Sequence, residues 1–303
     1  MTAPRNAFWS NLKKTKNRKS PELVETAGVS LHDFPISGAI VPLHPEYPEH
    51  WHNFYEMVIV LGGTGRHQVA EIEQTICSGH VFIIPPKLKH AYHAPEHLSL
   101  INVCFRKDFS GLDNGTLTSV PGYQALFTLE PNFRQVDPKN HMLMLDPSQL
   151  TTVEYLAKRL VHEARKRPAG YEAMARALLV ELICLLCRLY SAGSERPKYN
   201  PSRIEKVLKY LETEFREEID LSSLHTRFHY SQRNFYRLFK AGTGLTPMAY
   251  LQQVRLKEAA RLLKESDWPV TQIAFDVGFQ DSNHFSRRFR DSFGMSPSQF
   301  RDV

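Results

Sequence analysis

Cysteine is scarce in this sequence of 303 residues, and no long uninterrupted apolar run occurs in it. The four cysteines, Cys77, Cys104, Cys184 and Cys187, form no recognisable disulfide framework, which indicates a reducing compartment. Cys184 and Cys187 have the C-x-x-C spacing of redox and metal sites. They lie within the apolar, helix-like run ALLVELICLLCRLY, so we expect buried core thiols instead.

Membrane-spanning and secretory segments are also missing. Glu181 interrupts the most apolar stretch, so no run reaches the roughly 20 residues that cross a bilayer. The first twenty residues contain six basic residues, no acidic residue and no apolar core of a secretory signal. We expect a soluble, cytoplasmic protein with a basic arm over residues 1–30. This arm is either a disordered tail or a segment that docks on its own domain or on DNA phosphates.

The remaining composition is that of a globular protein. Hydrophobic residues make up 42% of the chain, and its length is sufficient for two domains with separate cores. The formal net charge is +6 and the pI about 9.1. Such a basic excess permits a nucleic acid partner without requiring one.

The pattern of short runs predicts four regions after the arm. Over 31–147, β-branched runs separated by Gly-Gly-Thr-Gly, Ser-Gly and Pro-Pro are typical of an all-β sandwich or barrel. Over 148–192 we expect two helices, with Ser148 as N-cap of the first. Residues 193–201, rich in Pro and Gly, read as a linker, and 202–303 as an all-helical domain.

The second helix of the 148–192 segment has a wide apolar stripe. Leu178, Leu182, Leu185 and Leu189 recur at helical spacing, with further apolar residues beside them. Packing on the β domain accounts for part of this stripe. A self-pairing dimer surface is the interpretation for the rest, so we expect a homodimer.

Two segments of the last hundred residues resemble each other. LSSLHTRFHYSQRNFYRLFKAGTGLTP begins at Leu221, and VTQIAFDVGFQDSNHFSRRFRDSFGMSP begins at Val270. Each has an apolar helix, a tight turn, a second helix, and then Gly-x-(Thr/Ser)-Pro. A repeat about fifty residues apart indicates one supersecondary unit used twice, and the pattern is that of a helix-turn-helix. Gly278 stands where the turn requires positive φ.

The stretch MAYLQQVRLKEAARLLKES between the two repeats predicts one continuous linker helix. Two recognition helices held at a fixed distance suit B-DNA, because its major grooves recur one helical turn apart on one face. Their polar residues suit the same partner, since Arg reads guanine, Asn and Gln read adenine, and Ser contacts bases or phosphates.

These residues resemble the DNA-binding domain of the AraC/XylS family of bacterial transcription regulators. The matching marks include Gly244, Pro247, Ile273-Ala274, Val277-Gly278-Phe279, Phe293-Gly294 and Ser296-Pro297. The resemblance implies base contacts from Arg233, Tyr236, Arg237, Ser282, Asn283, Ser286 and Arg287. His225 replaces the family's small alanine and His229 occupies the turn, so we expect a looser or rearranged first unit.

The N-terminal half resembles the cupin-type sensor domain of the same family, most closely that of the rhamnose-type sugar regulators. His50, His52, Glu56 and Gly63 fit the first cupin motif, H-x-H-x₃-E-x₆-G. Gly79, Pro85 and His90 fit the second, although Lys87 replaces its glycine. The resemblance implies a cupin-like barrel.

In metal-bearing cupins the residues that match His50, His52, Glu56 and His90 are the ligands, and this set suits Zn, Ni, Fe or Mn. The alternative is a metal-free pocket in which these side chains hydrogen-bond a small effector. Trp51 and Tyr92 would then be stacking platforms for a sugar.

Together these features predict a ligand-responsive transcription regulator, an activator of carbohydrate genes that binds double-stranded DNA as a homodimer and touches RNA polymerase. It needs no cofactor, apart from a possible divalent metal, and catalyses no reaction. One alternative is a metal-dependent cupin enzyme, or a metal sensor, with an attached DNA-binding domain. Another is a ligand-independent DNA-binding protein whose N-terminal half only dimerises.

Overall fold

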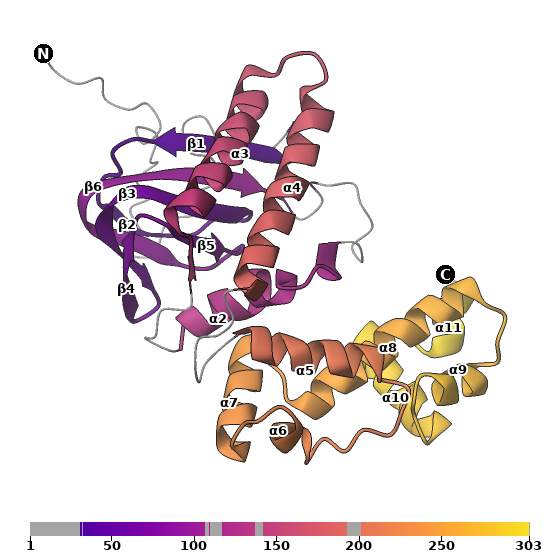
Figure 1. Ribbon diagram of the computed structural model, residues 1–303. Coiled ribbons are helices and arrows are strands. Elements are labelled where there is room, and N and C mark those ends of the chain that lie inside the picture. Colours follow the sequence, from indigo (N-terminus) through magenta and orange to yellow (C-terminus); the bar gives the residue numbers. More distant parts are fainter. Residues whose placement is uncertain are drawn as a thin grey trace, which may run out of the picture. The chain divides into compact units, whose positions relative to one another are not determined.

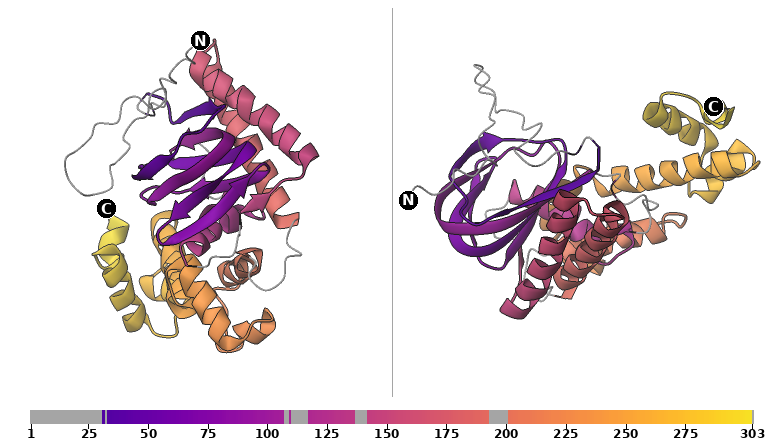
Figure 2. Two further views of the ribbon diagram at one scale, coloured as in Figure 1. Left: turned by 90° about the vertical axis from the view of Figure 1, so that its left-hand side faces the viewer. Right: turned by 90° about the horizontal axis from the view of Figure 1, so that it is seen from above.

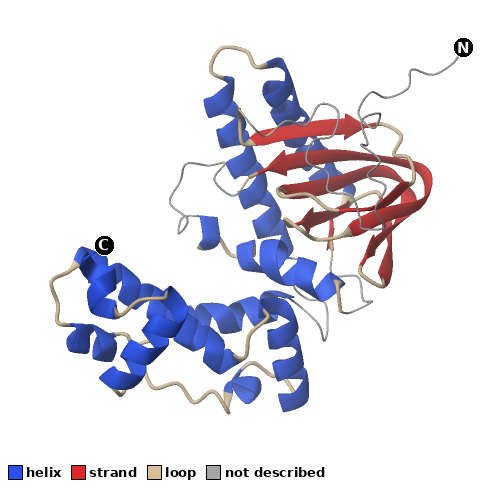
Figure 3. Cartoon of the chain, turned by 180° about the vertical axis from the view of Figure 1, so that it is seen from behind, coloured by secondary structure: helices blue, strands red, loops and turns tan. Residues whose placement is uncertain are grey.

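The computed structural model describes residues 31, 33–106, 109, 117–136, 142–192 and 201–302. These residues form two compact units, with the division between Ser202 and Arg203. All described strands belong to the first unit, and the second is helical (Figure 3). The predicted basic arm, residues 1–30, and most of the predicted linker lie outside the described residues; Pro201 already begins a helix.

The first unit is built on a seven-stranded sheet whose strands curve around a common interior (Figure 2). The strands follow the order β1-β6-β3-β5-β7, while β2 pairs with β6 and β4 with β3, all antiparallel where paired. Their bounds are β1 (Ile36–Val41), β2 (Tyr47–His50), β3 (Tyr55–Val69), β4 (Ile72–Cys77), β5 (His80–Ile84), β6 (His90–Phe105) and β7 (Leu143–Met144). A short helical stretch, η2 (Ala125–Leu129) followed by α2 (Glu130–Arg134), packs against β5.

Strand alternation divides the sheet into two apolar faces. On β3, Met57 and Ile59 belong to a core that also contains the flanking helices. Val58 and Val60 point the other way, into a second cluster that lines the interior. Glu56 lies two residues before Val58 and therefore faces the interior as well.

Two helices cover the outer face of the sheet: α3 (Pro147–Lys166) and α4 (Tyr171–Ala192), which pack side by side (Figure 1). Gly38 lets α3 approach β1 closely, because a Cβ there would lie 2.8 Å from Val161 Cγ2. The prediction of Ser148 as N-cap was wrong. Asp146 caps α3 through a capping box with Gln149, because Pro147 occupies the first helical position.

The apolar stripe of α4 is used mainly inside the first unit. Leu178, Leu182 and Cys187 are buried in the core shared with the sheet, and Cys184 packs against its edge. Leu185 and Leu189 are only partly buried, so the part of the stripe left for a partner chain is narrower than the sequence predicts. All four cysteines are free thiols.

The second unit consists of short helices around one long one, α8. Their bounds are α5 (Pro201–Thr213), α6 (Leu224–Arg227), α7 (Gln232–Thr243), α8 (Pro247–Glu265), α9 (Val270–Asp276), α10 (Ser282–Phe293) and α11 (Pro297–Asp302). The predicted linker helix is α8, an unbroken 19-residue helix that spans roughly 28 Å. Among the described residues, no helix combines the length and apolarity needed to cross a membrane.

Candidate DNA-binding surface and effector site

The second repeat forms a helix-turn-helix from α9, a tight turn and α10. The N–H of Phe279 donates to the carbonyl of Ala274 (3.0 Å), and Gly278 has a φ of +89°. Ile273, Ala274 and Phe285 are fully buried where the two helices meet. This confirms the prediction of a small residue at the crossing and of a glycine with positive φ in the turn.

The first repeat forms the same turn from different residues. The N–H of Tyr230 donates to the carbonyl of His225 (2.7 Å), and His229 adopts the left-handed conformation with a φ of +57°. A non-glycine residue in this region is uncommon, although histidine is enriched there. The two helix-turn-helix repeats differ in their leading helices, because α6 has four residues and α9 has seven.

The two recognition helices, α7 and α10, match closely. Each has 12 residues, starts after an extended residue and ends at a left-handed glycine, with φ of +74° at Gly244 and +76° at Gly294. The Asp281 carboxylate caps α10 by accepting from the N–H of His284. Each helix buries two phenylalanines in its unit, Phe235 and Phe239 in α7 and Phe285 and Phe289 in α10.

The opposite face of each recognition helix carries the residues predicted to contact DNA. Arg233, Tyr236 and Arg237 are exposed on α7, at the i, i+3 and i+4 positions that share one helix face. On α10, Asn283 and Arg287 are exposed and the two serines are partly exposed. The Ser286 hydroxyl donates to the carbonyl of Ser282 (2.9 Å), so its oxygen remains an acceptor. Both faces therefore offer donors that could reach base edges or phosphates.

The interior of the first unit gathers buried histidines from the end of β2, the loop that follows β2 and the start of β6. His50, His52 and His90 are 4%, 2% and 1% exposed. The ring centroids of His50 and His90 lie 4.0 Å apart, and those of His52 and His90 5.3 Å apart. The structure thus brings residues 50, 52 and 90 together, although His90 is forty positions from His50.

Each of these histidines is oriented by its own backbone. The Nδ1–H groups of His50, His52 and His90 donate to the carbonyls of Pro48 (2.9 Å), Phe54 (2.8 Å) and Leu88 (3.1 Å). A carbonyl can only accept, so the proton of each neutral ring lies on Nδ1 and Nε2 keeps a lone pair. The lone-pair nitrogens are thus presented to the interior in a fixed direction.

Glu56 meets two of these nitrogens. Its Oε2 lies 3.1 Å from His52 Nε2 and 3.8 Å from His90 Nε2. The ligand atoms of His52, Glu56 and His90 all lie within 4.8 Å of one another, whereas His50 falls outside this group. Three acceptors that converge without a donor between them require a shared proton or a cation.

Burial keeps several of these rings neutral. It lowers the pKa of His50 to about 4, partly offset by the hydrogen bond to Pro48 and the Glu56 carboxylate. Burial likewise places the pKa of His67 and that of His90 well below the usual histidine value. At neutral pH these side chains act as hydrogen-bond partners or ligands and carry no charge.

Several interior polar atoms have no hydrogen-bond partner among the described residues. They are both ring nitrogens of His67, His90 Nε2, the Tyr92 hydroxyl and Asn102 Oδ1. Buried polar groups are rarely left unpaired, so such a cluster indicates a place for water or a ligand. Asn102 was missed by the sequence interpretation. Its signal is a polar residue within the apolar run LINVCF, on the strand face that Ala39 and Val58 also occupy.

The predicted stacking residues differ in placement. Tyr92 is 3% exposed, and its ring lies 4.4 Å from that of His44 and 4.9 Å from that of His67. It therefore belongs to the interior cluster. Trp51 is only partly buried, between the buried His50 and His52, as expected for a side chain that alternates with its neighbours.

A buried ion pair lies on the helical side of this interior. Arg134 Nε is 2.7 Å from Glu130 Oε1, with the side chains 1% and 0% exposed. The Arg134 guanidinium lies 5.0 Å from the centre of the Phe82 ring, which in turn contacts His67 at 4.7 Å. The pair thus connects α2 to the inner lining, which no sequence motif indicated.

Comparison with known proteins assigns both units to domain families. Residues 43–134 match the AraC-like ligand binding domain, and residues 224–302 match a helix-turn-helix domain. The HTH-type transcriptional activator RhaS of Escherichia fergusonii is 34% identical over 268 residues, which cover 88% of this chain and 92% of that protein. RhaS of Escherichia coli O81 strain ED1a is 32% identical over 280 residues, which cover 90% of this chain and 95% of that protein.

Solved structures similar to a third of this chain include the DNA-binding domain of AdpA in complex with a target DNA. It is 31% identical and covers 33% of this chain and 90% of that one, with a TM-score of 0.32. A probable AraC family transcriptional regulator from Rhodopseudomonas palustris is also 31% identical. The match covers 33% of this chain and 94% of that one, with a TM-score of 0.31.

A sheet domain of the ligand-binding type and two helix-turn-helix units define a transcription regulator of two domains. The relatives align over nine-tenths of their own length. The chain belongs to the AraC family of regulators, as its sequence motifs predicted.

Proposed function

We propose that this protein is a sequence-specific DNA-binding transcription activator that responds to a small effector. The main support is the pair of matched recognition helices, α7 and α10, each with a polar and basic outer face within one compact unit. The relatives named above are transcriptional activators, which favours activation over repression. In this proposal Arg233, Tyr236, Arg237, Ser282, Asn283, Ser286 and Arg287 contact the DNA.

Selection of bound sites from a random double-stranded DNA library tests the DNA-binding function. The full chain should enrich one sequence, and Arg287→Ala should weaken its affinity for that sequence by roughly 10- to 100-fold through the loss of a base contact. Arg261→Ala is the matched control, because Arg261 pairs with Glu258 and Glu265 on the linker helix. No enrichment, or equal affinities for the R287A and wild-type proteins, would remove the support for this function.

The effector that suits the first unit is a small polyhydroxylated molecule, which includes sugars. Hydroxyl groups both donate and accept, so they can satisfy the lone pairs of His67 and His90 and the hydroxyl of Tyr92. The aromatic rings nearby offer apolar surface for stacking. The set proposed to line the site is His50, His52, Glu56, His90 and Tyr92, while Trp51, which alternates with its buried neighbours, is left out of it. This composition supports a sugar-responsive activator of carbohydrate genes over a regulator that needs no effector.

Three further parts of the proposal concern assembly and setting. The partly buried Leu185 and Leu189 support a homodimer through α4. An activator bound beside a promoter would act by touching RNA polymerase, in the cytoplasm, where the chromosome is. Because the relatives described above are named as activators, we propose regulation and not catalysis.

A metal-dependent sensor is the second candidate, and the convergence of His52, Glu56 and His90 favours it. Two imidazole nitrogens and one carboxylate oxygen suit Zn²⁺, Fe²⁺, Mn²⁺ or Ni²⁺. The hydrogen bonds from Nδ1 to Phe54 and Leu88 are those that orient metal-binding histidines. His50 would stand beside the ion and would not be a ligand, in contrast to the cupin-based prediction of four ligands.

Glu56→Gln separates a metal from a shared proton. The amide can donate to His52 Nε2, so metal-free E56Q should melt at a temperature equal to or above that of metal-free wild type. Added Co²⁺ should raise the melting temperature of the wild type and give about one ion per chain, whereas E56Q should gain little. Glu96→Gln, an exposed glutamate on the same sheet, is the control. Equal responses of wild type and E56Q to Co²⁺ would exclude this candidate.

A further inference from the structure

The segment between α5 and α6 leads into the first helix-turn-helix and also contacts the second. Phe215 follows α5 and precedes the first helix-turn-helix in the sequence. Its side chain nevertheless packs against the core of the second helix-turn-helix, around Leu256, Ile273 and Phe285. The carbonyls of this segment also face the turn of the second unit. A Cβ added to Gly278 would lie 2.7 Å from the carbonyl oxygen of Phe215 and 2.9 Å from that of Arg216. We call residues 215–217 the brace.

Arg255, in the middle of α8, holds the brace from the other side. Its Nε donates to the carbonyl of Phe215 (2.7 Å) and its Nη2 to that of Glu217 (2.9 Å). The guanidinium carbon also lies within 2.9 Å of the position that a Cβ of Gly278 would take. Arginine suits this role because its planar fork reaches two acceptors at once. One side chain thus contacts the linker helix, the brace and the turn of the second unit.

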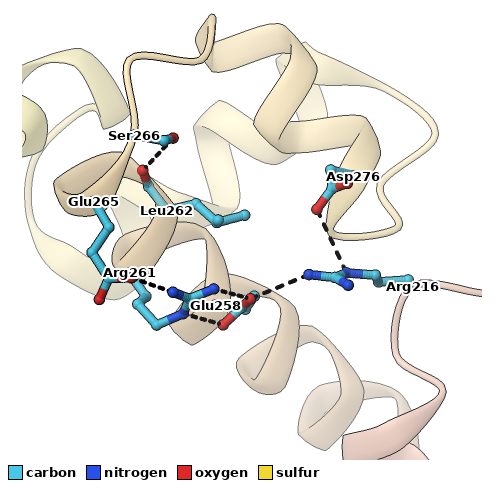
Figure 4. A network of polar contacts seen from close by, with 7 residues as sticks. All are labelled: Arg216, Glu258, Arg261, Leu262, Glu265, Ser266 and Asp276. Carbon is cyan, nitrogen blue, oxygen red and sulfur yellow. Dashed lines mark hydrogen bonds and ion pairs between the residues drawn. The ribbon is translucent and has the colours of Figure 1, made fainter.

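Ion pairs extend this arrangement to α8 and α9 (Figure 4). Arg216 lies between two carboxylates, 3.4 Å from Glu258 Oε1 on α8 and 3.5 Å from Asp276 Oδ2 at the end of α9. Glu258 is in turn held by Arg261, whose Nη2 lies 2.8 Å from Oε1. The two arginine side chains are about half-exposed and the carboxylates of Glu258 and Asp276 are 21% and 32% exposed. Each ion pair contributes little by itself, but together they align α9 with the linker helix.

The length of α8 sets the distance between the two helix-turn-helix units. A helix alone does not fix how each helix-turn-helix is rotated about the helix axis, which depends on local packing. The first turns of α8 pack against the first helix-turn-helix. There the Tyr250 hydroxyl donates to Glu212, and the Tyr250 ring contacts Phe239. Towards its end α8 holds α9 and α10. The brace adds a second connection between the two helix-turn-helix units, because the chain continues from residue 217 into α6. Two connections fix both the separation and the rotation.

We infer that the brace and Arg255 set the base-pair spacing that this protein accepts between the two stretches of DNA read by α7 and α10. Arg255 is a positioning residue in this inference, since it acts through the brace and touches no base. The inference deepens the DNA-binding function proposed above and rests on it.

Spacing is a sensitive readout on B-DNA. Each inserted base pair moves one site by about 3.4 Å and turns it by about 34° relative to the other. A rigid reader cannot follow such a change, whereas a hinged one can. Wild type should therefore bind the selected site about 100-fold more tightly than versions with one base pair inserted or deleted between the two contacted stretches, since one recognition helix loses its base contacts.

Arg255→Met tests the inference, because methionine keeps an unbranched apolar stem and removes both hydrogen bonds. The measurement is the affinity of the full chain for the selected, the lengthened and the shortened site. R255M should lower the preference for the selected spacing from about 100-fold to about tenfold or less, mainly by weakening its binding to the selected site. Hydrogen exchange in peptides that contain 214–222 should become faster in the same variant.

The control is Lys257→Met, which removes an exposed cation from the same helix, outside the ion pairs of Arg216, Glu258 and Arg261, and should keep the wild-type preference. If R255M does not fold, Arg255→Lys replaces it, since one ammonium group cannot reproduce the two-point contact. A variant whose affinities for all three sites fall in parallel, with the preference retained, would overturn the inference. Failure of the wild type to enrich any sequence would instead count against the DNA-binding function itself.

Discussion

Removing only the positive charge of the buried Arg134–Glu130 pair should destabilise the first unit far more than removing both charges. The side chains are 1% and 0% exposed, with 2.7 Å between Arg134 Nε and Glu130 Oε1. Arg134→Met keeps an apolar stem near the Phe82 ring but leaves the Glu130 carboxyl buried without its partner. Losing one member of a buried pair costs about 3 to 5 kcal/mol, whereas apolar replacement of both is often neutral. We therefore expect R134M to lose about 3 to 5 kcal/mol and R134M/E130L at most about 1 kcal/mol.

The same pair makes stability depend on pH. Burial raises the pKa of Glu130 to about 7, against the opposing effect of Arg134, from an ordinary value of 4.5. The folded state therefore keeps a proton that the unfolded state releases between these values. The stabilisation is complete below pH 4.5 and is lost as pH rises through 7, and its full size is roughly 3 kcal/mol. In R134M the carboxyl takes up a proton more readily, so its deficit relative to wild type should shrink as pH falls.

Pulsed hydrogen exchange in urea, read on peptides of β5, measures the stability of this unit within the full chain. Strand β5 is the appropriate probe because Arg134 donates to the carbonyl of Ile83. Samples equilibrated at pH 5 and pH 8 and labelled in one common pulse give the two stabilities. Equal losses in R134M and R134M/E130L, or an R134M deficit that does not change with pH, would refute this reasoning.

Three smaller changes test other parts of the account. Gly278→Ala should destabilise the second unit by several kcal/mol more than Gly294→Ala in urea unfolding, because both have positive φ but only the Cβ at 278 meets backbone atoms; equal losses would contradict the close approach. Asp281→Ala should lower helix stability by about 1 kcal/mol and speed exchange at the start of α10; unchanged exchange would show that the cap is dispensable. Leu189→Glu should shift the sedimentation of the full chain from dimer to monomer, with Glu181→Gln as control; an unchanged dimer would place the interface elsewhere.

The sequence predicted the second unit almost completely, because its signals are local. Gly278, the phenylalanines of α10 and the Gly-x-Ser-Pro end of the repeat each have one conformation that suits them. The contact of Phe215 with the second core was not predictable in this way. Arg255, forty positions along the chain, holds this segment through the backbone carbonyl of Phe215, and a backbone carbonyl leaves no residue-specific pattern in the sequence.

In the first unit the cupin motif predicted that His50, His52, Glu56 and His90 would meet. It could not show that His50 stands outside the group of three, since this depends on ring orientations fixed by the carbonyls of Pro48, Phe54 and Leu88. The sequence did not predict the buried positions of Asn102 and of the Arg134–Glu130 pair. A single polar residue in an apolar run, or a charged pair on a short helix, is usually exposed at the surface. Only the fold shows that they are buried.

A methylation-protection footprint of the full chain on its selected site tests the central claim most directly, namely that α7 and α10 read two successive major grooves. The account predicts two clusters of protected guanines about one helical turn apart. Arg287→Ala should erase one cluster and Arg233→Ala the other, each without loss of the remaining contacts. A single protected groove, or two clusters that survive both substitutions, would contradict it.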